Sequence, residues 1–218
     1  MKKLLSLLLL LLLPLTALAE HQVITLTVAG DTMPGSNEVV RPFDYSYDHY
    51  LATYGYAYPL EKMQSLLATD DITLVNLEIS LNSYFEAQYH RLIFRGKPEY
   101  ARVLSEGSVE IVNLANNHTD DYWGLGYKAT KEALDAVGVK YCGDTEFGRE
   151  LCWFDFPDGV RIGFIGIFPL YYTDHTWEVE TDFQRLRDAG CDVIIYSCHW
   201  GTEYSAGHNA LQEEMARV

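Results

Sequence analysis

The sequence predicts an α/β fold built from mixed β-sheet layers flanked by helices. Apolar runs of strand length recur along the chain, and helical spacing of apolar residues fills several of the intervals between them. One pair of runs is joined by Pro-Asp-Gly at residues 157–159, a strong hairpin signal. Strands that alternate with helices favour a largely parallel sheet, and the hairpin adds antiparallel strands to it.

The expected strands are short apolar or β-branched runs at residues 23–29, 72–77, 109–114, 139–142, 151–156, 160–168 and 192–198. The expected helices cover residues 59–68, 98–104 and 124–137, a segment that ends at 183–189, and a last one from 209 onward. Residues 32–58 are polar, aromatic and rich in Gly, Pro and Tyr, so we expect a long loop there.

Residues 1–19 have the pattern of a secretory signal peptide: a basic start, a short leucine-rich run and an Ala-Leu-Ala site. The run holds about ten apolar residues, whereas a membrane-spanning helix needs about 20. We expect cleavage after Ala19 and a secreted, periplasmic or cell-surface protein, in which residues 20–218 form one domain. The alternatives are an uncleaved membrane anchor and a lipoprotein, the latter disfavoured because no Cys follows the run.

The formal net charge of −15 disfavours nucleic acid and anionic lipid as partners, because phosphate binding needs clustered Lys and Arg. An anionic substrate would need a local cation, such as a metal ion. The four cysteines (Cys142, Cys152, Cys191 and Cys198) have no C-x-x-C spacing. They are compatible with two disulfides in an exported protein, of which Cys142–Cys152 is one candidate pair, and equally with buried thiols.

Metal-capable side chains follow four of the expected strands: Asp31, Glu78, the Asn117-His118 pair, and His199. If these strands are parallel neighbours, the side chains share one carboxyl edge of the sheet, where open α/β folds place their chemistry. Carboxylate, amide and imidazole groups suit Mn, Fe, Zn or Mg, bound as one ion or as two. Each feature alone has a structural alternative, since Gly-Asp is a common turn and a single His is often structural. Together they favour a metal or acid–base site.

Five motifs occur in a fixed order: G-D-T-M-P-G (30–35), N-L-E (76–78), F-R-G-K-P-E-Y (94–100), L-A-N-N-H-x-x-D-Y (114–122) and H-W-G-T-E-Y (199–204). This set resembles the capsule synthesis protein CapA family, the poly-gamma-glutamate biosynthesis proteins. That family is related to calcineurin-like metallophosphoesterases. The resemblance covers essentially all of residues 20–218 and implies a metallophosphoesterase-like fold.

The resemblance also implies roles for individual residues. The metal ligands would be Asp31, Glu78, Asn117 and His199. His118 would stabilise or protonate the leaving oxygen, and Asp121 would orient it. Arg95 and Lys97 are candidates to hold an anionic substrate, with a solvated loop as the alternative. Trp200, Glu203 and Tyr204 would line the pocket, although Trp200 could equally serve in packing.

Three departures from the family pattern stand out. Ser36 replaces an expected arginine, and Trp123 replaces an expected glycine, so the turn into the next helix could differ. The family's Gly-His-His-Pro-His signature does not occur before Val218, so we expect a C-terminally truncated copy that lacks some ligands.

The function implied is that of an exported, metal-dependent, phosphoesterase-like hydrolase in the biosynthesis of capsule, poly-gamma-glutamate or another cell-surface polymer. Its partners would be an anionic polymer or phosphorylated substrate and the capsule biosynthesis machinery. One alternative is a non-catalytic surface module that binds or tethers an anionic polymer. A truncated domain with no independent function is the other.

Overall fold

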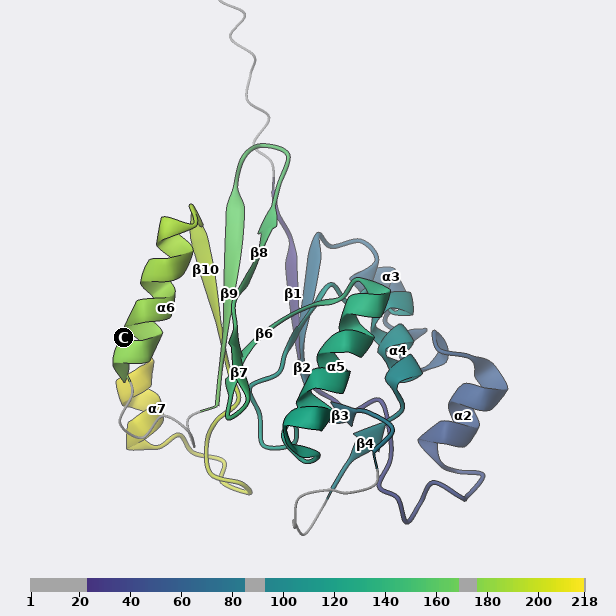
Figure 1. The fold of residues 1–218 in the computed structure, drawn as a ribbon. Helices are drawn as coiled ribbons and strands as arrows, with labels where there is room; N and C mark the ends of the chain where they lie inside the picture. Colours follow the sequence, from purple (N-terminus) through teal and green to yellow (C-terminus); the bar gives the residue numbers. More distant parts are fainter. Residues whose placement is uncertain (1–22, 85–92, 169–175, 218) are drawn as a thin grey trace, which may run out of the picture.

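The computed structural model describes residues 23–84, 93–168 and 176–217, so the predicted signal segment lies outside the described residues (Figure 1). The strands are β1 (Leu26–Thr32), β2 (Ile72–Leu77), β3 (Ser80–Leu81), β4 (Arg95–Gly96), β5 (Ile111–Asn113), β6 (Lys140–Thr145), β7 (Gly148–Glu150), β8 (Cys152–Asp155), β9 (Arg161–Ile167) and β10 (Val193–Cys198). The helices are α2 (Tyr47–Tyr54), α3 (Gln64–Leu67), α4 (Ala101–Glu106), α5 (Trp123–Val137), α6 (Thr176–Asp188) and α7 (Ala210–Met215), with 3-10 turns η1 (Tyr58–Leu60) and η2 (Pro98–Tyr100).

The strands form two main sheets and one small one. The first sheet has the order β1-β2-β5-β6-β7, in which β1, β2, β5 and β6 are parallel and β7 is antiparallel to β6. The second has the order β10-β9-β8, with β10 parallel and β8 antiparallel to β9. Strands β3 and β4 pair separately. The prediction of a mixed α/β fold, including the 151–168 hairpin, is confirmed.

The two main sheets pack face to face between two layers of helices. Helices α4 and α5 cover the outer face of the first sheet, and α6 and α7 cover the outer face of the second (Figure 1). The alternation along β2 shows how its residues are divided between the layers. Ile72 and Leu74 pack toward Phe164 of the second sheet, whereas Val75 and Leu77 pack with the α4 and α5 side chains. Each face of β2 is therefore buried.

The sheets come very close together near the carboxyl ends of their strands. A Cβ atom added to Gly166 in β9 would lie 2.1 Å from the Oδ1 atom of Asn113 in β5. Only glycine fits at such a distance. This contact keeps the carboxyl ends of the two sheets next to each other.

Several elements differ from the sequence prediction. Residues 47–54 form α2 inside the expected loop, with Ser46 as its N-cap accepting a bond from the His49 amide. Strand β1 runs through Gly30 and Asp31, where its register against β2 shifts, instead of ending there. The expected helix at 59–68 is broken into η1 and α3.

Helix α5 ends as predicted, because Gly138 adopts the left-handed conformation that glycine favours. Strand β10 is only partly buried. All four cysteines are free thiols, so the disulfide alternative is not realised.

None of the helices in the described part of the chain is both long enough and apolar enough to cross a membrane.

Candidate metal centre

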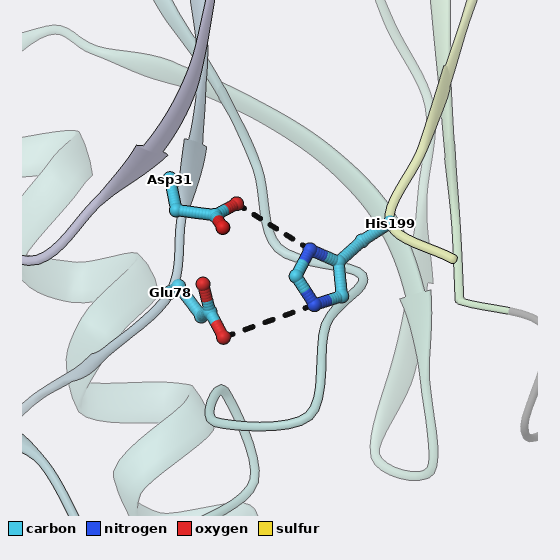
Figure 2. A group of neighbouring side chains, drawn as sticks. All are labelled: Asp31, Glu78 and His199. Carbon is cyan, nitrogen blue, oxygen red and sulfur yellow. Dashed lines mark ion pairs between the residues drawn. The ribbon is translucent and has the colours of Figure 1, made fainter. Parts of the chain in front are cut away.

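Asp31, Glu78 and His199 meet at one point between the two sheets. One ligand atom from each side chain lies within 4.8 Å of the other two. His199 faces both acids from the opposite side: its Nδ1 is 3.5 Å from Asp31 Oδ1 and its Nε2 is 3.8 Å from Glu78 Oε1 (Figure 2).

Backbone bonds hold all three positions. Asp31 lies near the end of β1, paired in register with Asn76 of β2. Glu78 follows β2 directly, and its amide donates to the Thr32 carbonyl at 3.1 Å. His199 follows β10, and its amide donates to the Ile167 carbonyl at 2.9 Å. His199 therefore comes from the second sheet. The expectation of a single carboxyl edge was wrong, because an apolar run does not specify which sheet its strand joins.

Asn117 completes the cluster from the loop after β5. Its Oδ1 atom lies 2.8 Å from His199 Nε2. A hydrogen bond from Asn117 also lowers the pKa of Glu78, opposing the effects that raise it. The structure thus brings all four predicted ligands together.

Burial and the charges of neighbouring groups shift the pKa values of Glu78 and His199. Burial raises the pKa of Glu78 to about 7, with a further contribution from the neighbouring Asp31 carboxylate. Burial lowers the pKa of His199, and Asp31 offsets only part of that effect. A neutral imidazole is the form that binds metal, and a cation would relieve the repulsion between the two acids.

The donors fit a divalent metal ion. Two carboxylates, one imidazole and one amide oxygen match the preferences of Mn, Zn, Fe or Mg, and the cluster contains no thiolate. Nothing in the donor set selects one of these metals over the others.

His118 and Asp121 form a second pair beside the cluster. His118 Nδ1 lies 2.9 Å from Asp121 Oδ2, which also accepts the Phe94 amide at 3.1 Å. The other ring nitrogen, Nε2, points toward the cluster and is 4.0 Å from Glu78 Oε1. The ring of Phe94 packs edge-on against His118 at 4.9 Å between centroids. The imidazole is held with one nitrogen on a buried carboxylate and the other facing the metal ligands.

The pKa of His118 is raised. Burial is the largest single effect and acts to lower it, but the hydrogen bond and charge of Asp121, together with the charges of Glu78 and Glu203, outweigh burial. His118 is thus suited to carry a proton near neutral pH. A carboxylate–imidazole pair of this kind is a common general acid.

Arg95 and Lys97 lie in and just after β4, and their side chains contact acids of the 38–48 segment. Arg95 is only 7% exposed, donating from Nε to Glu38 at 2.7 Å and from Nη1 to the Tyr84 carbonyl at 2.9 Å. Lys97 lies 3.5 Å from Asp48 and is exposed. Arg95 therefore does not lie in a solvated loop. Substrate binding by either residue stays a prediction.

The three predicted pocket residues after His199 have different surroundings. Trp200 is partly buried and packs on the core beneath α6 and α7. Glu203 is exposed, and its charge reaches His118. Tyr204 is 98% exposed and has a positive φ of 62°. Their role toward a substrate also stays a prediction.

Asn76 and Asn116 are the residues that sequence reasoning missed as site components. Asn76 donates to Asp31 Oδ1 at 2.7 Å and contacts His199 Nδ1 at 3.0 Å. Asn116 donates to Asn76 Oδ1 at 3.1 Å. Both were visible as amides at the ends of apolar strands, where a polar group needs a partner.

The fold and site define a class: an α/β/β/α protein with a metal-competent cluster between the carboxyl ends of two sheets. The sequence profile described as "Bacterial capsule synthesis protein PGA_cap" matches residues 25–218, and the chain belongs to this family. It is similar to "Capsule biosynthesis protein CapA" of Bacillus anthracis, with 22% identity over 223 aligned residues covering 91% of this chain and 52% of that protein. It is also similar to "PGA biosynthesis protein CapA" of Bacillus subtilis (strain 168), with 26% identity over 137 residues covering 55% of this chain and 36% of that protein. The chain thus spans about half the length of the first relative and about a third of the second.

Proposed function

We propose that this chain carries a metal-dependent, phosphoesterase-like hydrolase site that acts in the synthesis of capsule, poly-gamma-glutamate or another cell-surface polymer. The observation behind the proposal is the position of the His118–Asp121 pair, 4.0 Å from a cluster of metal-capable side chains. Membership of the capsule synthesis family and the names of the two relatives support the polymer context.

The residues divide into two groups by role. Asp31, Glu78, Asn117 and His199 would hold the ion, which when bound polarises a phosphoryl oxygen and lowers the pKa of water. His118 would donate its proton to the leaving oxygen, because its Nε2 faces the cluster and its Nδ1 is held by Asp121. Asp121 keeps the imidazole oriented and supports its charged form.

Hydrolysis of bis(p-nitrophenyl) phosphate by the purified chain tests this function. We expect activity with Mn²⁺ that EDTA abolishes, and a loss of at least about 100-fold in His118→Asn. The double variant Asp31→Ala plus His199→Ala should lose both bound metal and activity. His208→Ala is the matched control, because His208 is exposed and pairs with Glu213 outside the cluster. Equal metal content in the double variant and the parent would contradict the proposal.

A non-catalytic, polymer-binding module is the second candidate. An exposed stack of three tyrosines, Tyr50, Tyr54 and Tyr58, favours it, because exposed apolar patches mark interaction surfaces. Binding of poly-gamma-glutamate that persists in EDTA, with no phosphodiesterase activity, would support this module over the hydrolase. Binding that disappears in EDTA would exclude it.

We also propose that the protein is exported, on the basis of residues 1–19 alone. N-terminal sequencing of the protein recovered from the cell envelope or medium should start at Glu20. Recovery of the intact Met1 terminus from cytoplasm would overturn export.

A further inference from the structure

One buried asparagine connects the two sheets at the cluster. Asn76 lies in β2 in register with Asp31 of β1, and it follows Ile72 and Leu74 on the face turned toward the second sheet. Its Nδ2 atom contacts Asp31 Oδ1 at 2.7 Å and His199 Nδ1 at 3.0 Å. The amide group of Asn76 therefore touches one candidate ligand from each sheet.

The hydrogen-bond pattern assigns both hydrogens of this amide. Asp31 Oδ1 can only accept when ionised, so one hydrogen points to it. The second hydrogen points to His199 Nδ1, which then acts as the acceptor. The proton of the neutral ring consequently sits on Nε2, where it donates to Asn117 Oδ1 at 2.8 Å.

Asn116 holds Asn76 in this orientation. Its Nδ2 donates to Asn76 Oδ1 at 3.1 Å and to the Leu77 carbonyl at 2.9 Å. Its Oδ1 accepts the backbone amides of His118 and Thr119, both at 3.0 Å. Asn116 is only 1% exposed, and flipping its amide would place acceptor against acceptor at Asn76 and donor against donor at the His118 and Thr119 amides. The loop that carries His118 therefore fixes the orientation of the Asn76 amide through the hydrogen bond from Asn116.

We propose that Asn76 is a positioning residue that fixes the Asp31 carboxylate for metal binding and sets the tautomer of the metal-free His199 ring, with Asn116 connecting it to the His118 loop. The inference rests on the proposed metal site and adds a residue to it. Groups that orient metal ligands contribute to affinity, and losing one typically weakens binding about 10- to 100-fold.

Titration with Mn²⁺ by calorimetry tests the metal-binding consequence. We expect Asn76→Ala to raise the Kd for Mn²⁺ about 10- to 100-fold. Asn82→Ala is the matched control, because Asn82 is a fully buried asparagine with side-chain bonds to Ser80 and Tyr84 instead of the cluster. Both variants should lower the Tm, but Asn82→Ala should leave the Kd within about twofold. An unchanged Kd in Asn76→Ala would overturn the proposal.

The tautomer of His199 gives a readout that does not need the metal. Long-range ¹H–¹⁵N spectra at pH 8 in EDTA should show the Nε2–H tautomer in the wild type. Asn76→Asp keeps the size of the side chain but only accepts hydrogen bonds, so it should shift the ring to Nδ1–H. An unchanged Nε2–H signal would contradict the positioning role even if Asn76→Ala does not fold. Failure of the wild type to bind Mn²⁺ would instead contradict the proposed function, and the tautomer would still test Asn76.

Discussion

The Nε2 atom of His199 lies 2.8 Å from the Oδ1 atom of Asn117, although 82 residues separate the two in the chain. His199 belongs to the second sheet and Asn117 to a loop of the first, so this contact forms only after the sheets have packed together. The candidate site is therefore a property of the sheet–sheet interface.

Asp121→Asn should lower the pKa of His118. Burial would then be opposed only by the charges of Glu78 and Glu203, without the hydrogen bond and charge of Asp121. NMR titration of the His118 ring checks this, and phosphodiesterase activity near neutral pH should fall about 10- to 100-fold. Glu203→Gln, which removes a weaker contribution from an exposed acid, should produce a smaller shift. A larger shift in Glu203→Gln than in Asp121→Asn would refute the assigned pair.

Glu78→Gln should stabilise the protein at pH 8 in EDTA but not at pH 4.5. The folded-state pKa of about 7 exceeds the ordinary 4.5, so between these values the folded state retains a proton that the unfolded state has lost. Stability therefore falls as pH rises through that window, by on the order of 3 kcal/mol, and the neutral glutamine removes this loss. Urea unfolding at both pH values measures it. Glu132→Gln on the exposed face of α5 is the control, and identical pH profiles for Glu78→Gln and wild type would contradict the shift.

Trp123→Gly should raise the free energy of unfolding by roughly 0.5–1 kcal/mol. Trp123 has φ of 59° and is 51% exposed, so glycine would relieve left-handed strain of about 1–2 kcal/mol, offset in part by the loss of the buried half of the side chain. Leu125→Gly is the control: it is also exposed and in α5, but has no positive φ, so it should destabilise by about 1 kcal/mol. Equal destabilisation by both variants in urea would argue against strain at Trp123.

The four thiols should react slowly in the folded protein. Cys142 and Cys191 are buried, and burial raises the pKa of Cys152 and of Cys198 to about 12. With Ellman's reagent at pH 8, we expect less than one thiol per chain to react rapidly in the native protein. All four thiols should react after denaturation. Two equivalents in the denatured, unreduced protein would indicate a disulfide that the structure does not contain.

The alternation of strands and helices was predictable because each apolar run carries its own local pattern. The end of α5 at Gly138 and the hairpin of β8 and β9 depend on turn chemistry that is visible in a few residues. Helix α2 was missed because its tyrosines, aspartate and histidine give a weak amphipathic pattern, although Ser46 was available as an N-cap.

The arrangement of the site was only partly predictable. Asp31, Glu78, Asn117 and His199 stood out as polar groups after apolar runs, and the structure brings them together. The placement of His199 on a separate sheet depends on long-range packing such as the Gly166–Asn113 approach, which no local pattern records. Asn76 was overlooked because its role depends on two partners that are distant in sequence.

Anomalous diffraction at the Mn absorption edge, from crystals of the chain grown with Mn²⁺, tests the central claim most directly. We predict a peak between Asp31, Glu78 and His199, at roughly 2.0–2.3 Å from one atom of each. Absence of a peak there, or a peak only at the exposed His208–Glu213 pair, would contradict the assignment of this cluster as a metal centre.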